Sequence, residues 1–306
     1  MKRTEFRGAV FKRDNHQCVC CSKLAVDAHH ILDRSLFEDG GYVLENGASL
    51  CESCHWDAEK GLISPKLLWE KLGVKPYLPP NFDTIYDYDK WGKILSPYRK
   101  YPSILHLPFS ANLINDDKGL RDCAQFENRE VVVTEKLDGE NTSGYWDGKI
   151  HARSLDSANH PTRNWVKQLL SNKLYELPPG YRICGENVYA KHSIEYRNLK
   201  SYFYLFSVWN QDICLSWDDT IEWAELLEIE TVPLLYRGQW NEKRIQEIYQ
   251  EYTVSKNDEV EGYVVRNTCS FSYTDFSSNM AKYVRKNHVQ TSAHWMNEAI
   301  IKNGLT

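Results

Sequence analysis

The sequence of 306 residues has no apolar run that approaches the ~20 residues of a membrane-spanning helix. We also see no signal peptide, so we expect neither a membrane segment nor secretion. The sequence also has no excess of basic residues, because its formal net charge is −5. This charge excludes a protein that coats nucleic acid by bulk attraction, and any polyanion must meet a local patch. Such a patch could form near the N-terminus from Lys2, Arg3, Arg7, Lys12 and Arg13.

Nine cysteines are present, and several of them form close pairs. Without a secretory signal, this pattern indicates metal ligands in a reducing cytoplasm rather than disulfides. Two C-x-x-C pairs, Cys18 with Cys21 and Cys51 with Cys54, have the spacing of zinc knuckles. Four thiolates suit a closed tetrahedral zinc site that holds a small domain together. Cys20 could replace a neighbour as ligand, although Cys18 and Cys21 have the better spacing.

Histidines and an asparagine lie between and after these knuckles. His29 and His30 occur in "DAHHILDRSLF", Asn46 occurs in "LENGASL", and His55 directly follows the last cysteine. Glu59 stands four residues after His55, so both share one face of a predicted helix. Over residues 7–61 this order resembles the HNH endonuclease family with its ββα-metal site.

The HNH resemblance implies that His29, His55 and Glu59 bind a catalytic divalent ion. His30 would be the general base that activates water, and Asn46 would brace the loop between the two strands. Many relatives carry a third histidine or nothing at the position of Glu59, so the metal and its coordination number stay open. The alternative is a catalytically silent zinc module that grips nucleic acid or a partner.

Three regions follow from the pattern along the chain. The zinc-rich domain spans residues 1–73 and closes with a helix that Ser64 caps, Pro65 begins and Gly73 ends. Residues 74–100, rich in Pro and Tyr, predict a linker or an extended arm. Residues 101–306 then form a second domain.

Strands dominate this second domain, with helices predicted at Pro161–Tyr175 and Ile245–Tyr252. The predicted strands are "VVVTEK", "NTSGYW", "KIHARS", "YFYLFSVW" and "VEGYVVR". Asp147 and Gly148 join the second and third of these as a two-residue hairpin turn. We therefore predict an α+β fold in which a small zinc-bound domain precedes a domain of antiparallel sheets.

The segment "EKLDGEN", residues 135–141, follows a hydrophobic strand. It resembles motif I of the covalent nucleotidyltransferases, the superfamily of ATP-dependent ligases and capping enzymes. The resemblance implies that Lys136 attacks the α-phosphate of ATP and holds AMP, with Glu135 and Asp138 at the nucleotide site. A lysine with a pKa near ~10.4 is protonated at neutral pH. We therefore expect neighbouring cations and a bound Mg²⁺ or Mn²⁺ to lower the pKa of Lys136.

The other motifs of that superfamily follow in the expected order over residues 100–295. Any one of them is a weak signal, but five in register are specific. His151, His160 and His192 could touch phosphates, but we expect solvated or locally satisfied side chains there. The resemblance implies Arg153 in "HARS", Glu186 in "ICGENVYAKHS" for ribose or metal, Phe206 or else Tyr204 in "YFYLFSVW" for adenine, Glu261 in "EVEGYVVR" for metal, and Lys282 with Arg285 or Lys286 in "MAKYVRKNHV" for phosphates.

The branch of the superfamily is indicated by what surrounds these motifs. The residues after Lys286 are too few for the oligonucleotide-binding barrel that follows motif V in DNA ligases and capping enzymes. "YPSILHLPFS" and "KYVRKNHVQTSAHW" resemble the RNA-ligase branch. We expect an ATP-dependent ligase that joins 3′-OH and 5′-phosphate ends of RNA, of a nicked duplex or of an RNA/DNA hybrid. HNH cleavage normally leaves those ends, which favours nucleic acid repair or processing. A protein that senses nucleotides without turnover is the alternative of another class.

Overall fold

The computed structural model describes residues 1–80, 82, 86–95, 97–110, 118–157, 159–256, 259–286 and 300–306. The chain divides into two compact units, Met1–Tyr98 and Arg99–Thr306. Among the described residues, no helix is both long and apolar enough to cross a membrane. Most of the expected segment "KYVRKNHVQTSAHW" falls on residues 287–299, which lie outside the described ranges.

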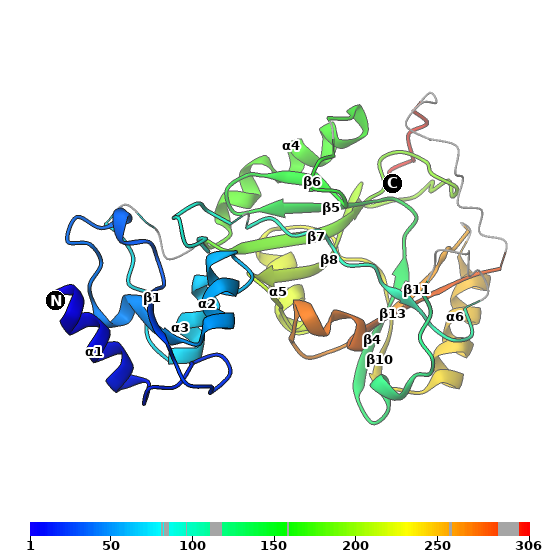
Figure 1. Cartoon of the computed structure of the whole chain (residues 1–306). Coiled ribbons are helices and arrows are strands. Elements are labelled where there is room, and N and C mark those ends of the chain that lie inside the picture. The colour runs from blue at the N-terminus through cyan, green and yellow to red at the C-terminus, as the bar shows by residue number, and fades with distance from the viewer. Residues whose placement is uncertain are drawn as a thin grey trace. The chain divides into compact units, whose positions relative to one another are not determined.

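Among its described residues, the first unit combines one antiparallel strand pair with three α-helices (Figure 1). As predicted, the Ser64 hydroxyl caps the third helix by accepting from the N–H of Leu67, and Gly73 ends it with a φ of 64°. Buried Cys18, Cys51 and Cys54 are part of its hydrophobic core. Its elements are α1 (Arg3–Arg13), β1 (Asp27–His30), β2 (Gly47–Leu50), α2 (Glu52–Glu59) and α3 (Pro65–Leu72).

The segment expected as a linker contributes to this core. Tyr88 is 5% exposed and buried within it. Tyr77, Leu78, Phe82 and Tyr86 pack against the same cluster with part of their surface buried. The aromatic side chains that made this stretch look irregular therefore supply apolar area to the first unit.

The second unit is built on two sheets, and its mainly antiparallel α+β architecture agrees with the prediction (Figure 1). One sheet has the strand order β10-β4-β11-β13-β3, in which only β13 and β3 are parallel among the named pairs. It comprises β3 (Leu105–His106), β4 (Glu130–Lys136), β10 (Leu234–Gln239), β11 (Gly262–Asn267) and β13 (Met280–Val284).

The other sheet has the order β12-β9-β8-β7-β5-β6. The predicted hairpin around Asp147 and Gly148 is present, but its turn has three residues rather than two, because Gly144 of β5 pairs with Ile150 of β6 and the N–H of Tyr145 donates to the carbonyl of Lys149 at 2.9 Å. Its strands are β5 (Glu140–Tyr145), β6 (Ile150–Ala152), β7 (Tyr181–Asn187), β8 (Phe203–Asn210), β9 (Ile213–Cys214) and β12 (Phe271–Ser272). Helices α4 (Asn164–Lys173), α5 (Trp217–Leu226) and α6 (Glu242–Ser255) complete the unit and include both predicted helices.

Strand β4 is buried on both faces, which explains its unbroken run of valines. Val131 and Val133 pack in the cluster that contains residues of α6, whereas Val132 packs in a different cluster. Side chains alternate along a strand. Glu135 is therefore expected on the α6 side of β4, and Lys136 on the opposite side.

Candidate functional site

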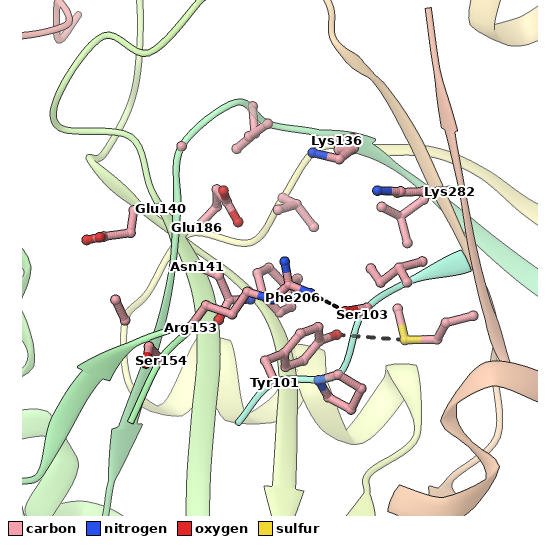
Figure 2. A pocket seen from close by; sticks show the side chains of 18 of the residues that line it. Tyr101, Ser103, Lys136, Glu140, Asn141, Arg153, Ser154, Glu186, Phe206 and Lys282 are labelled. Carbon is pink, nitrogen blue, oxygen red and sulfur yellow. Dashed lines mark hydrogen bonds between the residues drawn. The ribbon is translucent and has the colours of Figure 1, made fainter. Parts of the chain in front are cut away.

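A pocket of about 1130 Å³ is lined by residues of both sheets of the second unit. Motif I crosses between the sheets here, because β4 belongs to one sheet and β5 to the other. Figure 2 shows Lys136 and Lys282 with their ammonium groups turned into the pocket, and Glu186 across from them. The space is large enough for a nucleotide.

The pocket wall from the first of these sheets follows from the two-residue period of its strands. In the cross-strand register, Val264 lies opposite both Thr134 and Lys282. Alternate residues of three adjacent strands thus reach the same side. The wall contains Thr134 and Lys136 from β4, Val264 and Arg266 from β11, and Met280 and Lys282 from β13.

Lys136 forms an ion pair with Glu261. Its Nζ lies 2.6 and 2.7 Å from the two carboxylate oxygens. Burial acts to lower the pKa of the Lys136 ammonium, but the carboxylates of Glu261 and Glu186 outweigh it, so the pKa is raised. The expected lowering of this pKa by basic neighbours is therefore wrong for the protein alone, because the nearest charges are negative.

Glu186 faces the same space. Removal from bulk water raises the pKa of its carboxyl group to about 8, with Lys136 opposing this shift and Glu261 and Asp138 adding to it. The pair of acidic side chains around one ammonium is an oxygen donor set of the kind that Mg²⁺ and Mn²⁺ prefer. Glu186 lines the pocket, and Glu261, which is absent from the described lining, is held on Lys136; these two carboxylates are the oxygen donors that would fit a divalent ion beside the lysine.

The aromatic wall of the pocket contains Phe206 rather than Tyr204. The register between β7 and β8 shifts at Cys184 and Gly185, which leaves Phe206 as the extra residue of a bulge. Phe206 lines the pocket and meets the ring of Tyr101 edge to face, with ring centroids 5.1 Å apart. Tyr204 is absent from the described lining, and its hydroxyl accepts from the N–H of Lys200 at 2.9 Å.

The basic residues expected on phosphates divide into two groups. Arg153 and Lys282 line the pocket, and Arg153 also donates to the hydroxyl of Ser103 (Figure 2). Arg285 instead donates to Glu259 at 2.5 Å, and neither it nor Lys286 lines the pocket as described. The order of the motifs in the sequence did not show which of these four basic residues line the pocket.

The two acids of motif I are held by protein groups. The Glu135 carboxylate accepts from the hydroxyl of Tyr252 on α6 at 2.7 Å and pairs with Lys256, which directly follows that helix, as the strand alternation predicts. Oδ2 of Asp138 accepts from the backbone N–H groups of Ser193 and Ile194, each at 2.8 Å. Both carboxylates are thus bound by protein groups; Glu135 also lines the pocket, whereas Asp138 is absent from its described lining.

Several lining residues were missed by the sequence interpretation. Arg266 ends the segment "EVEGYVVR", and its alternation with Val264 was a signal that could have placed it. His160 and His192, expected to be solvated or locally satisfied, also line the pocket. Lys118 does so from a stretch without any recognised motif.

In the first unit, the four predicted zinc ligands converge. Their sulfur atoms all lie within 4.8 Å of one another, and Sγ of Cys21 is 3.5 Å from Cys51 and 3.7 Å from Cys54. Zn–S bonds of about 2.3 Å in a tetrahedron place sulfurs about 3.8 Å apart. A hydrogen bond with Ser53 lowers the pKa of Cys51, whereas burial raises the pKa of Cys54, so the first thiolate of the cluster forms at Cys51.

A second cluster joins β1 to α2. Nδ1 of His29 and Nε2 of His55 lie 3.5 and 3.4 Å from Oε1 of Glu59. Burial, followed by the charges of Lys90 and His55, lowers the pKa of His29 to about 3. This histidine is therefore neutral at physiological pH, as a metal ligand must be. Asp27, which the sequence interpretation missed, shares a strand face with His29 and lies 3.1 Å from Nε2 of His55.

The remaining residues of the HNH resemblance lie beside this cluster. Asn46 is fully buried and joins the backbone of Leu32 to that of Gly41 through its side-chain amide. His30 follows His29 on β1, and its ring stacks on Phe6 at 4.6 Å. Its Nε2 is buried and has no hydrogen-bond partner among the described residues.

Comparison with solved structures gives distant similarities. An archaeal ATP-dependent RNA ligase is 18% identical, with a TM-score of 0.42, and the match covers 61% of this chain and 48% of that one. A putative ATP-dependent DNA ligase from Aquifex aeolicus is 21% identical (TM-score 0.38; 53% and 45% covered). A Naegleria gruberi RNA ligase mutant with ATP and Mn is 16% identical (TM-score 0.39; 78% and 71% covered).

The chain spans about half the length of the first two of these proteins. The comparison with curated proteins gave no match. A family model described as RNA ligase matches residues 129–284, which are just over half of the chain and include Lys136, Glu186, Glu261 and Lys282. The chain therefore belongs to the RNA ligase family.

Proposed function

We propose that the second unit is an ATP-dependent RNA ligase with Lys136 as its nucleophile. The observation that carries this proposal is that Lys136, Glu186 and Lys282 line one pocket of nucleotide size, with Glu261 on the lysine. Lysine, two acids and a second cation are what adenylate transfer to an amine requires. The family match supports the reaction class.

In the first step, the Lys136 amine forms a bond to the α-phosphorus of ATP, and the bond to the bridging oxygen breaks so that pyrophosphate leaves. The amine must first lose its proton, and the pair with Glu261 opposes this loss. A divalent ion held by Glu261 and Glu186 would neutralise carboxylate and phosphate charge. Lys282 and Arg153 would hold the phosphates, and Phe206 would stack on adenine.

In the second and third steps, AMP passes from Lys136 to a 5′-phosphate, and a 3′-OH then attacks that phosphate and expels AMP. Lys136 regains its proton and returns to Glu261. The proposed substrate is an RNA end, with nicked duplexes and RNA/DNA hybrids as the forms to be compared.

The test is incubation with α-labelled ATP and Mg²⁺, followed by denaturing electrophoresis. Wild type should retain the label, and Lys136→Ala should not. Sealing is then scored on matched RNA, DNA and hybrid nicks. Nucleotide binding without a covalent label would instead identify a nucleotide sensor. Sealing by Lys136→Ala would overturn the mechanism.

We further propose that the first unit binds structural zinc and carries a metal-dependent HNH nuclease. The specific observation is the cluster of His29, His55 and Glu59 on a ββα arrangement next to the four cysteines. Two imidazoles and one or two carboxylates suit a transition metal or Mn²⁺. Such a site leaves 3′-OH and 5′-phosphate ends, which are the ends that the ligase joins.

Two variants separate this nuclease from a silent zinc module. His29→Ala should lose the divalent ion, while His30→Ala should bind Mn²⁺ as wild type does and cut neither RNA nor DNA. Metal content is measured alongside cleavage. If wild type itself never cuts, the silent module that grips substrate is the better description of the first unit.

A further inference from the structure

Residues 300–306 dock along the loop that follows β7. The N–H of Lys191 donates to the carbonyl of Ile301 at 2.7 Å, and the N–H of Leu199 donates to the carbonyl of Gly304 at 3.0 Å. In return, the N–H of Gly304 donates to the carbonyl of Tyr196 at 2.8 Å. The two segments are thus joined by backbone bonds in both directions.

Asn303 lies at the centre of this docked segment and is only 2% exposed. Its Oδ1 accepts from the N–H of Tyr196 at 2.9 Å, and its Nδ2 donates to the carbonyl of Val188 at 2.8 Å. One side chain therefore ties the beginning of the loop to its far end. Its carbonyl also accepts from the hydroxyl of Tyr202 at 2.9 Å.

The same loop holds the turn that follows the nucleophile. Ser193 binds Oδ2 of Asp138 through its hydroxyl at 2.6 Å as well as through its N–H. The hydroxyl of Tyr196 accepts from the N–H of Asp138 at 2.8 Å. Next to Asp138, a Cβ on Gly139 would lie 2.5 Å from the carbonyl oxygen of Asn187. The turn at Asp138 and Gly139 is therefore in direct contact with the loop after β7, whose two ends are joined by Asn303.

We propose that Asn303 is a positioning residue for Lys136, acting through residues 188–196 and Asp138; this inference rests on the proposed adenylation of Lys136. Without its side-chain amide, the buried N–H of Tyr196 and the carbonyl of Val188 lose their bonds. The loop then relaxes, and with it the turn two residues beyond the nucleophile. In-line attack is sensitive to shifts of about 1 Å, which can cost roughly 10²-fold in rate.

Asn303→Ala tests the proposal directly, and three further variants are compared with it. Gly304→Ala should displace residues 300–306 from the loop by a steric clash, because its Cβ would lie 2.7 Å from the carbonyl oxygen of Arg197. Ile301→Ala is the matched control within the segment, since that side chain is 58% exposed. Leu170→Ala removes a fully buried side chain from a separate core cluster and controls for lost stability.

The measurements are the single-turnover rate of lysyl-AMP formation at saturating ATP, the ATP affinity and the Tm. For Asn303→Ala and Gly304→Ala the rate should fall about 10- to 100-fold, with affinity within about threefold of wild type. Ile301→Ala should match wild type, and Leu170→Ala should lower Tm without slowing the rate per folded molecule. Asn303→Asp keeps the acceptor but sets a buried carboxylate oxygen against the carbonyl of Val188, so its rate should fall at least as far as that of Asn303→Ala.

The proposal is overturned if Asn303→Ala reacts at the wild-type rate or slows no more than Leu170→Ala. Amide hydrogen exchange gives a second readout: Asn303→Ala should speed exchange at Asp138, Ser193 and Ile194, and Leu170→Ala should not. If wild type forms no lysyl-AMP, the proposed function fails by itself. Unchanged exchange at those three amides would then still overturn the positioning role.

Discussion

Both candidate sites hold a lysine against a glutamate, and the two lysines reach their partners by different routes. Lys136 ends a central strand and pairs with Glu261 from the neighbouring segment. Lys90 comes from the aromatic stretch after α3 and contacts Oε1 of Glu59, the atom that also faces His29 and His55. In the first pair the lysine is the proposed nucleophile. In the second pair, Lys90 contacts the carboxylate of Glu59, which a metal ion would need as a ligand.

The two units also differ in how they are stabilised. The second unit contains four clusters of buried hydrophobic residues among those described, whereas the first has one, and that one includes three of the four cysteines. A small core that depends on metal ligands should fail when the metal is removed. A larger apolar core should not.

The largest expected effect is therefore loss of the first unit on zinc removal. A strong chelator, or Cys51→Ser, should abolish its cooperative unfolding transition, because structural zinc contributes on the order of 10 kcal/mol to such domains. The transition of the second unit should persist. Calorimetry of the whole chain with and without chelator measures both, and Cys269→Ser, an exposed cysteine outside the cluster, is the control. A first unit that melts unchanged after zinc is lost would contradict the difference in stabilisation.

The next effect concerns Glu261. Glu261→Gln removes the charge that raises the pKa of Lys136, so the free amine becomes more available. It also removes one of the two carboxylates that fit a divalent ion. We expect the loss of the ion ligand to outweigh the gain in free amine, so that lysyl-AMP formation falls about 10²- to 10³-fold.

The measurement is the adenylation rate as a function of pH and Mg²⁺ concentration. The acidic limb of the rate should move to lower pH in Glu261→Gln, since the lysine loses its proton more readily. Glu259→Gln is the matched control, because that acid pairs with Arg285 and not with Lys136. A faster reaction in Glu261→Gln would show that Glu261 only restrains the lysine.

These contrasts show which parts of the site a sequence can predict. Lys136, Glu186 and Lys282 belong to local motifs, and strand alternation places such residues on one face, so their meeting in a pocket could be predicted. The choice of Phe206 over Tyr204 depends on a bulge that has no sequence signature. The carboxylate of Asp138 could contact a ligand, but it accepts a hydrogen bond from Ser193 instead. Ser193 is 55 residues away in the sequence, so this contact could not be predicted.

Lys90 marks the same limit in the first unit. Its stretch has no periodicity, and the aromatic residues that pack on the core, together with the bond from the N–H of Asp33 to the carbonyl of Lys90, place it beside Glu59. Tertiary docking of an irregular segment cannot be inferred from residue spacing. The convergence of the four cysteines could be predicted, because two C-x-x-C pairs have the spacing that is typical of metal ligands.

The smallest expected effect is on the metal affinity of the histidine cluster. Lys90→Met removes a positive charge that competes with a divalent ion for Glu59, so Mn²⁺ should bind about 3- to 10-fold more tightly, or by about 1 kcal/mol for a partly screened pair. Lys93→Met, on an exposed residue of the same stretch, should leave affinity unchanged. Titration calorimetry with the zinc site filled gives both constants. Weaker binding of Mn²⁺ in Lys90→Met would mean that Lys90 orients Glu59 toward the ion. The two lysine–glutamate pairs would then have different roles. Only the pair of Lys136 and Glu261 would have to separate before its site can react.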